Sequence, residues 1–136
     1  MDQEEIKALL EQAARTLQEN QPNLFEFTED TDQTEWNITS HYAVEVSKLF
    51  PGFEYDVDLK KPSVQNKRPD IVLHRRGTHD SNLLVIEMKR KQEDVSEEIE
   101  KIEKSWFPPP LRYQYGAVVV ISGIGSFSVV VLKNET

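Results

Sequence analysis

The sequence predicts an α/β fold in which helices flank a mixed β-sheet, in the order α-α-β-β-β-α-β-β. Two amphipathic stretches open the chain, and five short runs rich in Val, Ile and Leu follow them. A charged helical stretch between the third and fourth runs supplies the crossover that two parallel strands need. A chain of 136 residues, 38% of them hydrophobic, can build a single domain (1–136) with one substantial core.

Two amphipathic helices are predicted ahead of the sheet. Residues 1–20 carry apolar side chains at helical spacing behind Asp2, a good N-cap, so they form an N-terminal helix added to the rest of the domain. The second helix is expected from about Thr34 to Phe50, where a Pro-Gly pair ends it. The polar residues 20–32 between the two helices are expected to be a connection.

The five apolar runs predict five strands. The first alternates apolar and acidic residues and is typical of a half-exposed strand, whereas the second and third are continuously apolar and typical of central strands. A helix is expected between the third and fourth strands, ended by three consecutive prolines. The strands are predicted at 53–59, 70–74, 83–89, 117–122 and 127–132, and the helix at 95–106.

Composition excludes several classes of protein. The chain has no cysteine, which rules out disulfides, thiolate metal sites and cysteine catalysis. Its apolar runs are too short to span a bilayer, and the first residues carry acids in place of an export signal. We therefore expect a cytoplasmic protein with no membrane partner.

The net charge of −8 is unevenly distributed along the chain. Residues 60–91 hold nine basic and three acidic side chains, a net of +6 in an otherwise acidic protein. Phosphate binding responds to such a local field more than to the overall charge, although basic residues also keep loops hydrated. The candidate nucleic-acid contacts are Lys60, Lys61, Lys67, Arg68, Arg75, Arg76, Arg90 and Lys91.

Charged residues stand at the ends of the two central strands. Asp70 opens one of them, and Glu87, Met88 and Lys89 close the next. Because side chains alternate between the faces of a sheet, Glu87 and Lys89 should share one side and Met88 the other. Two carboxylates can hold Mg²⁺, and a nearby ammonium can orient or deprotonate a metal-bound water, which predicts phosphodiester cleavage. The alternative is that strand ends carry charge because they meet water.

Two glutamates of the second helix are further candidates. Helical spacing places Glu35 and Glu45 toward the packed side, where a carboxylate without a partner is costly. Glu35 lies in the first turn, where it could reach the carboxylate edge of the sheet. The alternatives are a capping or dipole role for Glu35 and a nearby lysine partner for Glu45.

The Pro69-Asp70 pair and the Glu87-Met88-Lys89 triplet resemble the motif of the PD-(D/E)XK nuclease superfamily. The runs 69–77 and 82–89 are similar to those of small prokaryotic and phage members, and the likeness covers residues 34–122. The superfamily core of helix, three strands, helix and strand is similar to the predicted order. The resemblance therefore implies a restriction-endonuclease-like sheet.

The same resemblance implies roles for individual residues. Asp70 and Glu87 would bind the metal, Met88 would add its backbone carbonyl, Glu35 would be the accessory acid and Lys89 would activate the attacking water. The implied reaction is hydrolysis of DNA with Mg²⁺ or Mn²⁺. The chain has no room for a separate target-reading domain, so a sequence-specific restriction enzyme is not expected. A homodimer is possible, with the first helix as its contact.

Two other classes of function stay open. One is a nucleic-acid-binding or regulatory protein that keeps the nuclease fold without turnover. The other is a protein-interaction or immunity-like factor that uses the acidic residues 1–59 as its contact surface. The complete set of two acids and one lysine favours the enzyme.

Overall fold

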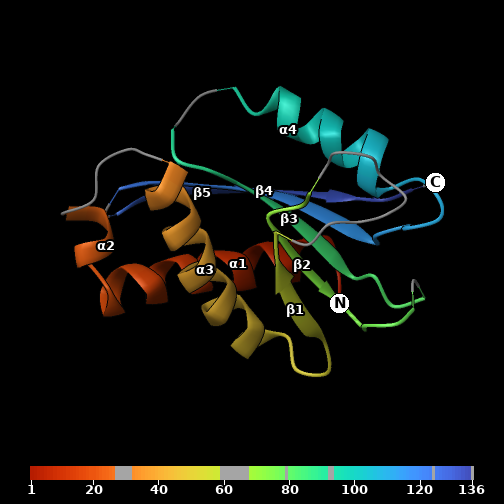
Figure 1. Cartoon of the computed structure of the whole chain (residues 1–136), viewed down its shortest axis with the longest axis horizontal. Helices are drawn as coiled ribbons and strands as arrows, with labels where there is room; N and C mark the ends of the chain where they lie inside the picture. The colour runs from red at the N-terminus through yellow and green to blue at the C-terminus, as the bar shows by residue number, and fades with distance from the viewer. Residues whose placement is uncertain (27–31, 59–67, 79, 92–93, 124, 136) are drawn as a thin grey trace.

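A computed structural model of the chain shows one five-stranded sheet with helices on both faces (Figure 1). The structure describes residues 1–26, 32–58, 68–78, 80–91, 94–123 and 125–135, with the backbone alone at 26 and 32–35. The predicted α/β class and the mixed sheet are confirmed. Among the described residues, no helix has both the length and the apolar character that a membrane span requires.

In the described part of the chain, three helices precede the sheet: α1 (Gln3–Asn20), α2 (Asn23–Glu26) and α3 (Asp32–Leu49). The predicted cap of α1 is confirmed, since the Asp2 carboxylate accepts the backbone N–H of Glu5 at 2.9 Å. The prediction of a plain connection over 20–32 is wrong at α2. There Pro22 suits the start of a helical turn, and the apolar pair Leu24 and Phe25 packs against the core.

The five strands lie side by side in the order in which they occur in the chain. They are β1 (Glu54–Val57), β2 (Ile71–His74), β3 (Leu84–Lys89), β4 (Tyr115–Gly123) and β5 (Ser126–Lys133). Only β3 and β4 run parallel, and the other neighbours are antiparallel. The predicted meander of three strands and the helical crossover before the fourth are therefore present.

The crossover helix differs from its prediction. An α-helix was expected over 95–106, but α4 covers only Ser96–Lys101 and a π-helical segment, η1 (Ile102–Trp106), continues it. The N–H of Phe107 donates to the carbonyl of Ile102 at 3.0 Å, which is the i→i+5 bond of a π-helix. The observed order of elements thus differs from the predicted one at two points, where α2 follows α1 and where η1 follows α4.

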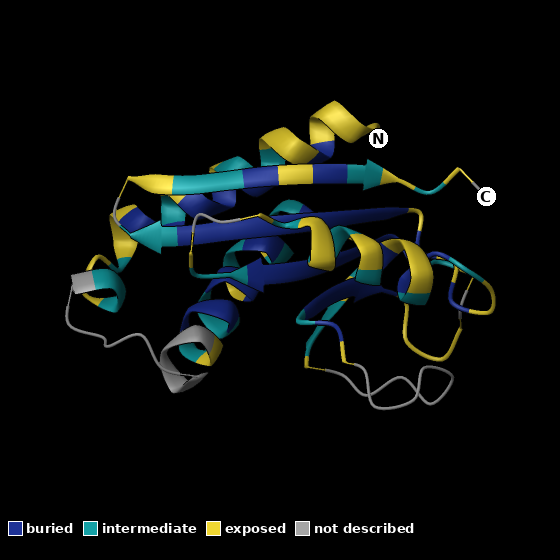
Figure 2. Ribbon diagram, turned by 90° about the horizontal axis from the view of Figure 1, so that it is seen from above, coloured by how far each residue is buried: buried dark blue, intermediate teal, exposed yellow. Residues whose placement is uncertain are grey.

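The sheet separates two apolar layers. Helices α1 and α3 cover one face, and α4 with η1 covers the other (Figure 1). Strands β2 and β3 are buried along most of their length, as predicted for central strands, and β4 is largely buried as well (Figure 2). The apolar stripe of α1 belongs to the first layer, with Ile6, Leu10 and Leu17 fully buried. A homodimer formed through α1 would therefore use its exposed face, because the apolar face is already covered.

A glycine in β4 allows η1 to lie close to the sheet. A Cβ added at Gly116 would collide with the side chain of Ile102 and would lie 3.4 Å from Phe107 Cε1. Since Ile102 is fully buried, it has little freedom to move away. The absence of a side chain at this position thus sets how η1 packs on β4.

We expect Gly116→Ala to lower the free energy of unfolding by about 1–3 kcal/mol, the usual cost of overpacking a core. Gly123→Ala is the matched control, because its added methyl would meet nothing within 4 Å in the same strand. Urea denaturation of both variants measures the difference. Equal stability of the two would show that η1 does not depend on this close approach.

Candidate functional site

Asp70 and Glu87 lie opposite each other at the end of β2 and β3. In this antiparallel pair Ile71 faces Ile86, so one further step of the register places Asp70 across from Glu87. The Asp70 Oδ2 accepts the backbone N–H of Met88 at 2.7 Å, which holds the carboxylate against the neighbouring strand. The two acids predicted from the motif therefore lie next to each other on neighbouring strands.

The Glu87 carboxylate is almost fully buried, with 3% of the residue exposed. Its Oε1 lies 3.1 Å from Lys101 Nζ, and its Oε2 accepts the indole N–H of Trp106 at 3.1 Å. Both donors come from the α4–η1 crossover. Sequence reasoning identified neither Lys101 nor Trp106 as a partner of Glu87.

The π-helical segment explains how both donors reach one carboxylate. Lys101 and Trp106 are five residues apart. In an α-helix of 3.6 residues per turn, such positions would point about 140° away from each other. The i→i+5 pattern instead brings positions five apart close to the same side of the helix. The segment η1 is thus the local structure that directs Lys101 and Trp106 toward Glu87.

Burial and mutual repulsion set the protonation of the two acids. Burial and, second to it, the charge of Asp70 together raise the pKa of Glu87 to about 7, against the opposing effects of Lys101 and Trp106. The pKa of Asp70 is also raised by burial, although the Met88 N–H and Lys101 oppose the change. Two poorly hydrated carboxylates with one contacting ammonium form a site whose negative charge is incompletely balanced.

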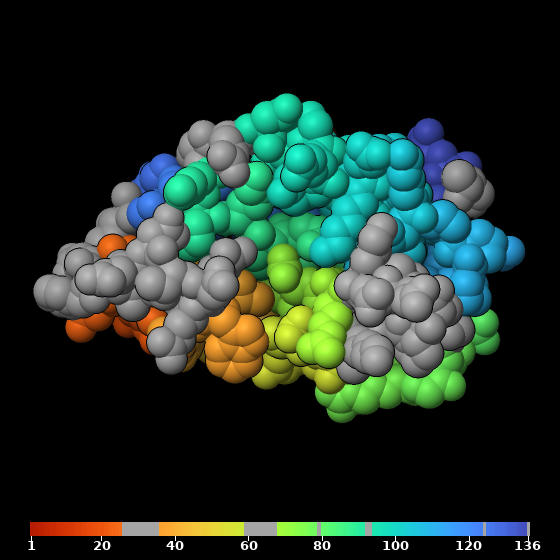
Figure 3. Space-filling model, turned by 45° about the horizontal axis from the view of Figure 1, so that its top comes forward, coloured from red at the N-terminus to blue at the C-terminus, as the bar shows by residue number. Residues whose placement is uncertain are grey.

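Lys89 lies on the same side of the sheet as Glu87, as predicted, and Met88 packs in the opposite apolar layer. The Lys89 ammonium contacts Glu98 Oε1 of α4 at 3.2 Å. The structure therefore supplies two amines on this face, Lys89 beside Glu98 and Lys101 beside Glu87. Figure 3 looks onto the face that α4 covers, where this helix (teal to cyan) lies above the green β2–β3 region.

The other predicted acids have different outcomes. Glu35 lies in the first turn of α3, but its side chain is outside the described part of the structure. Glu45 forms an ion pair with Lys48 at 3.0 Å, which is the alternative interpretation given for it. Among the described residues, no group of three or more histidine, aspartate and glutamate side chains is arranged to hold a metal ion.

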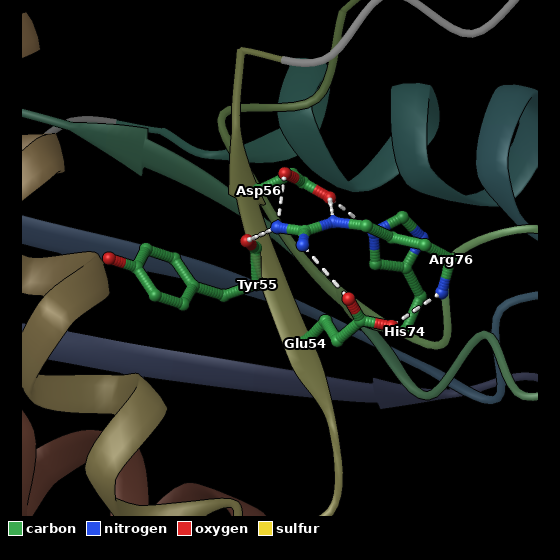
Figure 4. A network of polar contacts seen from close by, with 5 residues as sticks. All are labelled: Glu54, Tyr55, Asp56, His74 and Arg76. Carbon is green, nitrogen blue, oxygen red and sulfur yellow. Dashed lines mark hydrogen bonds and ion pairs between the residues drawn. The ribbon is translucent and has the colours of Figure 1, made fainter.

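One predicted phosphate contact, Arg76, is paired with acidic side chains of the protein itself. The Arg76 guanidinium donates to both oxygens of Asp56, at 3.0 and 2.9 Å, and to Glu54 at 2.9 Å (Figure 4). The Nε2 of His74 lies 2.6 Å from the same Asp56 carboxylate. Hydrogen bonds from Arg76 hold the pKa of Asp56 below its usual value. This network ties the loop after β2 to β1, so Arg76 has a structural role.

The remaining predicted contacts differ in environment. Lys60, Lys61 and Lys67 lie outside the described residues. Arg68 faces Asp58 at 3.6 Å, with both side chains about half exposed, and the Arg75 guanidinium lies 5.5 Å from the centre of the Phe53 ring. Arg90 differs from these residues: its guanidinium nitrogens Nε and Nη1 are buried and have no hydrogen-bond partner in the described structure. Of the predicted contacts that the structure describes, those with exposed side chains are Arg68, Arg75, Arg76 and Lys91.

Comparisons of the chain with protein-family models, with curated proteins and with solved structures find no match. Adjacent carboxylates with raised pKa values can bind a cation, share a proton or hold an ammonium, and here Lys101 supplies the ammonium.

The raised pKa of Glu87 predicts that stability falls as pH rises in metal-free buffer. Between its ordinary value of 4.5 and about 7, the folded state binds more protons than the unfolded state, so the free energy of unfolding decreases with pH. The shift corresponds to roughly 3 kcal/mol at about 1.4 kcal/mol per pKa unit. Urea denaturation at pH 5 and 7.5 in EDTA measures it.

Glu87→Gln, which resembles the protonated acid, should remove most of this pH dependence. Glu103→Gln, which changes an exposed glutamate of η1, should leave it as in the unmodified protein. The depressed pKa of Asp56 acts in the opposite sense and only at lower pH, so it does not obscure the comparison. An unchanged pH dependence in Glu87→Gln would contradict the assignment to Glu87.

Proposed function

We propose that the chain is a metal-dependent phosphodiesterase of the PD-(D/E)XK type, with a restriction-endonuclease-like sheet, that hydrolyses DNA. The observation that carries the proposal is the placement of Asp70 opposite Glu87 at the ends of two neighbouring strands. Both acids have raised pKa values, so the site gains from a further positive charge. Two amines, Lys89 and Lys101, lie on the same face of the sheet.

The residues present fit a hard divalent cation. Oxygen ligands suit Mg²⁺ or Mn²⁺, and Asp70, Glu87 and the Met88 carbonyl would hold the ion, with Glu35 as the proposed accessory acid. Such an ion would balance the charge that develops on the phosphate and make a bound water more acidic. In hydrolysis the water oxygen forms a bond to phosphorus, the bond to the leaving oxygen breaks, and the leaving oxygen takes up a proton.

The protein's own side chains would organise this reaction. Lys89, on the same side as Glu87, would orient the attacking water after its ammonium leaves Glu98. The acids of α4 and η1 disfavour the approach of a polyanion across that helix. We therefore propose that DNA reaches the site from the side of Arg68, whose backbone carbonyl borders the site and whose exposed side chain would contact phosphates.

The test of the reaction is cleavage of supercoiled plasmid and of single-stranded DNA and RNA with Mg²⁺ or Mn²⁺. Asp70→Asn and Lys89→Met should each reduce the rate by at least about 100-fold, as expected for loss of a metal ligand or of a proton-transfer group. Lys104→Met is the matched control, because it removes an exposed lysine from the same crossover helix.

A cleavage rate that is the same in Asp70→Asn and the unmodified protein would contradict the site. Failure of the unmodified protein to cut any of these substrates would contradict the enzyme. Chelation with EDTA should abolish activity and leave the folded state intact, as followed by circular dichroism.

A second candidate function is nucleic-acid binding without turnover. The observation that favours it is that both Glu87 oxygens already have protein donors, Lys101 and Trp106. Salt-sensitive DNA binding in the absence of cleavage, unchanged by EDTA, would support this function over the enzyme.

A further inference from the structure

We infer that Lys101 is an internal cation that occupies the metal position of the site, and that a divalent cation binds there by displacing its ammonium. This inference rests on the proposed function, because it concerns the same two carboxylates. It assigns Lys101 as a positioning residue that controls access of the metal to Glu87.

The groups that surround Lys101 Nζ are ones that bind cations. The ammonium lies 3.1 Å from Glu87 Oε1 and 3.4 Å from the backbone carbonyl oxygen of Arg68. It also lies 5.9 Å from the centre of the Trp106 ring, within the range of a cation–π contact. A carboxylate, a carbonyl and an aromatic face thus surround one positive charge beside Asp70, whose carboxylate it also influences.

The two donors to Glu87 differ in their freedom to leave. Trp106 is fully buried and Ile102, in the same segment, packs against Gly116, so the indole donor is fixed. The Lys101 side chain is 31% exposed, and its flexible stem can carry the ammonium into water. Glu87 Oε2 is therefore the fixed oxygen, and Oε1 is the oxygen that can exchange Lys101 for another cation.

Charge balance gives the direction of the exchange. When both carboxylates are ionised, the one contacting ammonium leaves one negative charge uncompensated, whereas a divalent cation balances both. Displacement also returns the ammonium to water, where it is well hydrated. The stronger the contact of Lys101 with Glu87, the more Lys101 opposes metal binding. When metal is absent, the same contact stabilises the buried Glu87 carboxylate.

The experiment compares Mn²⁺ binding to the unmodified protein and to Lys101→Met by isothermal titration calorimetry. Methionine keeps an apolar stem against Trp106 and removes the charge. We expect Lys101→Met to bind Mn²⁺ about tenfold more tightly, a difference of about 1.4 kcal/mol. Lys104→Met, whose lysine pairs with Glu100 on the exposed side of the helix, should bind Mn²⁺ as the unmodified protein does.

A measurement on the unmodified protein covers the case in which Lys101→Met fails to fold. Mass spectrometry can follow the rate at which acetic anhydride modifies each lysine. Mn²⁺ should increase the modification of Lys101 at least about threefold if its ammonium moves from Glu87 into water. The rate at Lys104 serves as the internal control.

Equal Mn²⁺ affinity in the unmodified protein and Lys101→Met, with no change in Lys101 modification, would overturn the displacement while leaving the metal site of the proposed function intact. Absence of Mn²⁺ binding in both proteins would overturn the displacement and the metal site together. Tighter binding in Lys101→Met without any DNA cleavage would support the displacement and contradict the nuclease.

Discussion

The burial of the Glu87 carboxylate is the constraint on which the local structure depends. A nearly inaccessible carboxylate is tolerated only where charged or polar donors satisfy it. Lys101 and Trp106 supply those donors, and they can do so together because the crossover ends in a π-helical turn. The π-helical segment lies close to the sheet because Gly116 has no side chain. A single buried acid thus connects the end of β3, the geometry of the crossover and the residue choice in β4.

The arrangement around Glu87 differs from that of an ordinary hydrophobic core. Two well-packed apolar residues at the positions of Asp70 and Glu87 would avoid both desolvation and mutual repulsion. The structure instead retains two adjacent carboxylates with raised pKa values, at a cost in stability near neutral pH. Perturbed acids gathered at one place are characteristic of functional sites, although structural ion-pair networks also produce them. The contact of Lys101 suits both a structural ion pair and a binding site. It stabilises the Glu87 carboxylate, and its partly exposed ammonium can still leave that carboxylate for another cation.

Periodicity was sufficient to predict the sheet and the side on which the site lies. Alternation along β3 places Glu87 with Lys89 and sends Met88 into the other layer, and apolar runs located all five strands. The same reasoning could not find Lys101 and Trp106 as partners of Glu87. Their five-residue spacing fits no α-helical pattern, and the π-helical turn depends on packing against β4, which is remote in the sequence. The short α2 was missed because its stability comes from two side chains packed on the core and not from a periodic pattern.

The net charge of a sequence segment does not predict the charge that the folded protein presents at its surface. The segment 60–91 has a net charge of +6, and this excess suggested a surface for phosphate. Arg76 belongs to that segment, yet Glu54 and Asp56 surround it, and these acids come from the strongly acidic first part of the chain. Folding therefore cancels part of the local excess by pairing two segments of opposite charge across β1 and β2. The field that a polyanion meets depends on the basic groups that remain exposed, and Arg68 is partly screened by Asp58 in the same way. Electrostatic attraction at this site is consequently weaker than the sequence suggests, so tight binding of DNA would require the metal itself to supply much of the positive charge.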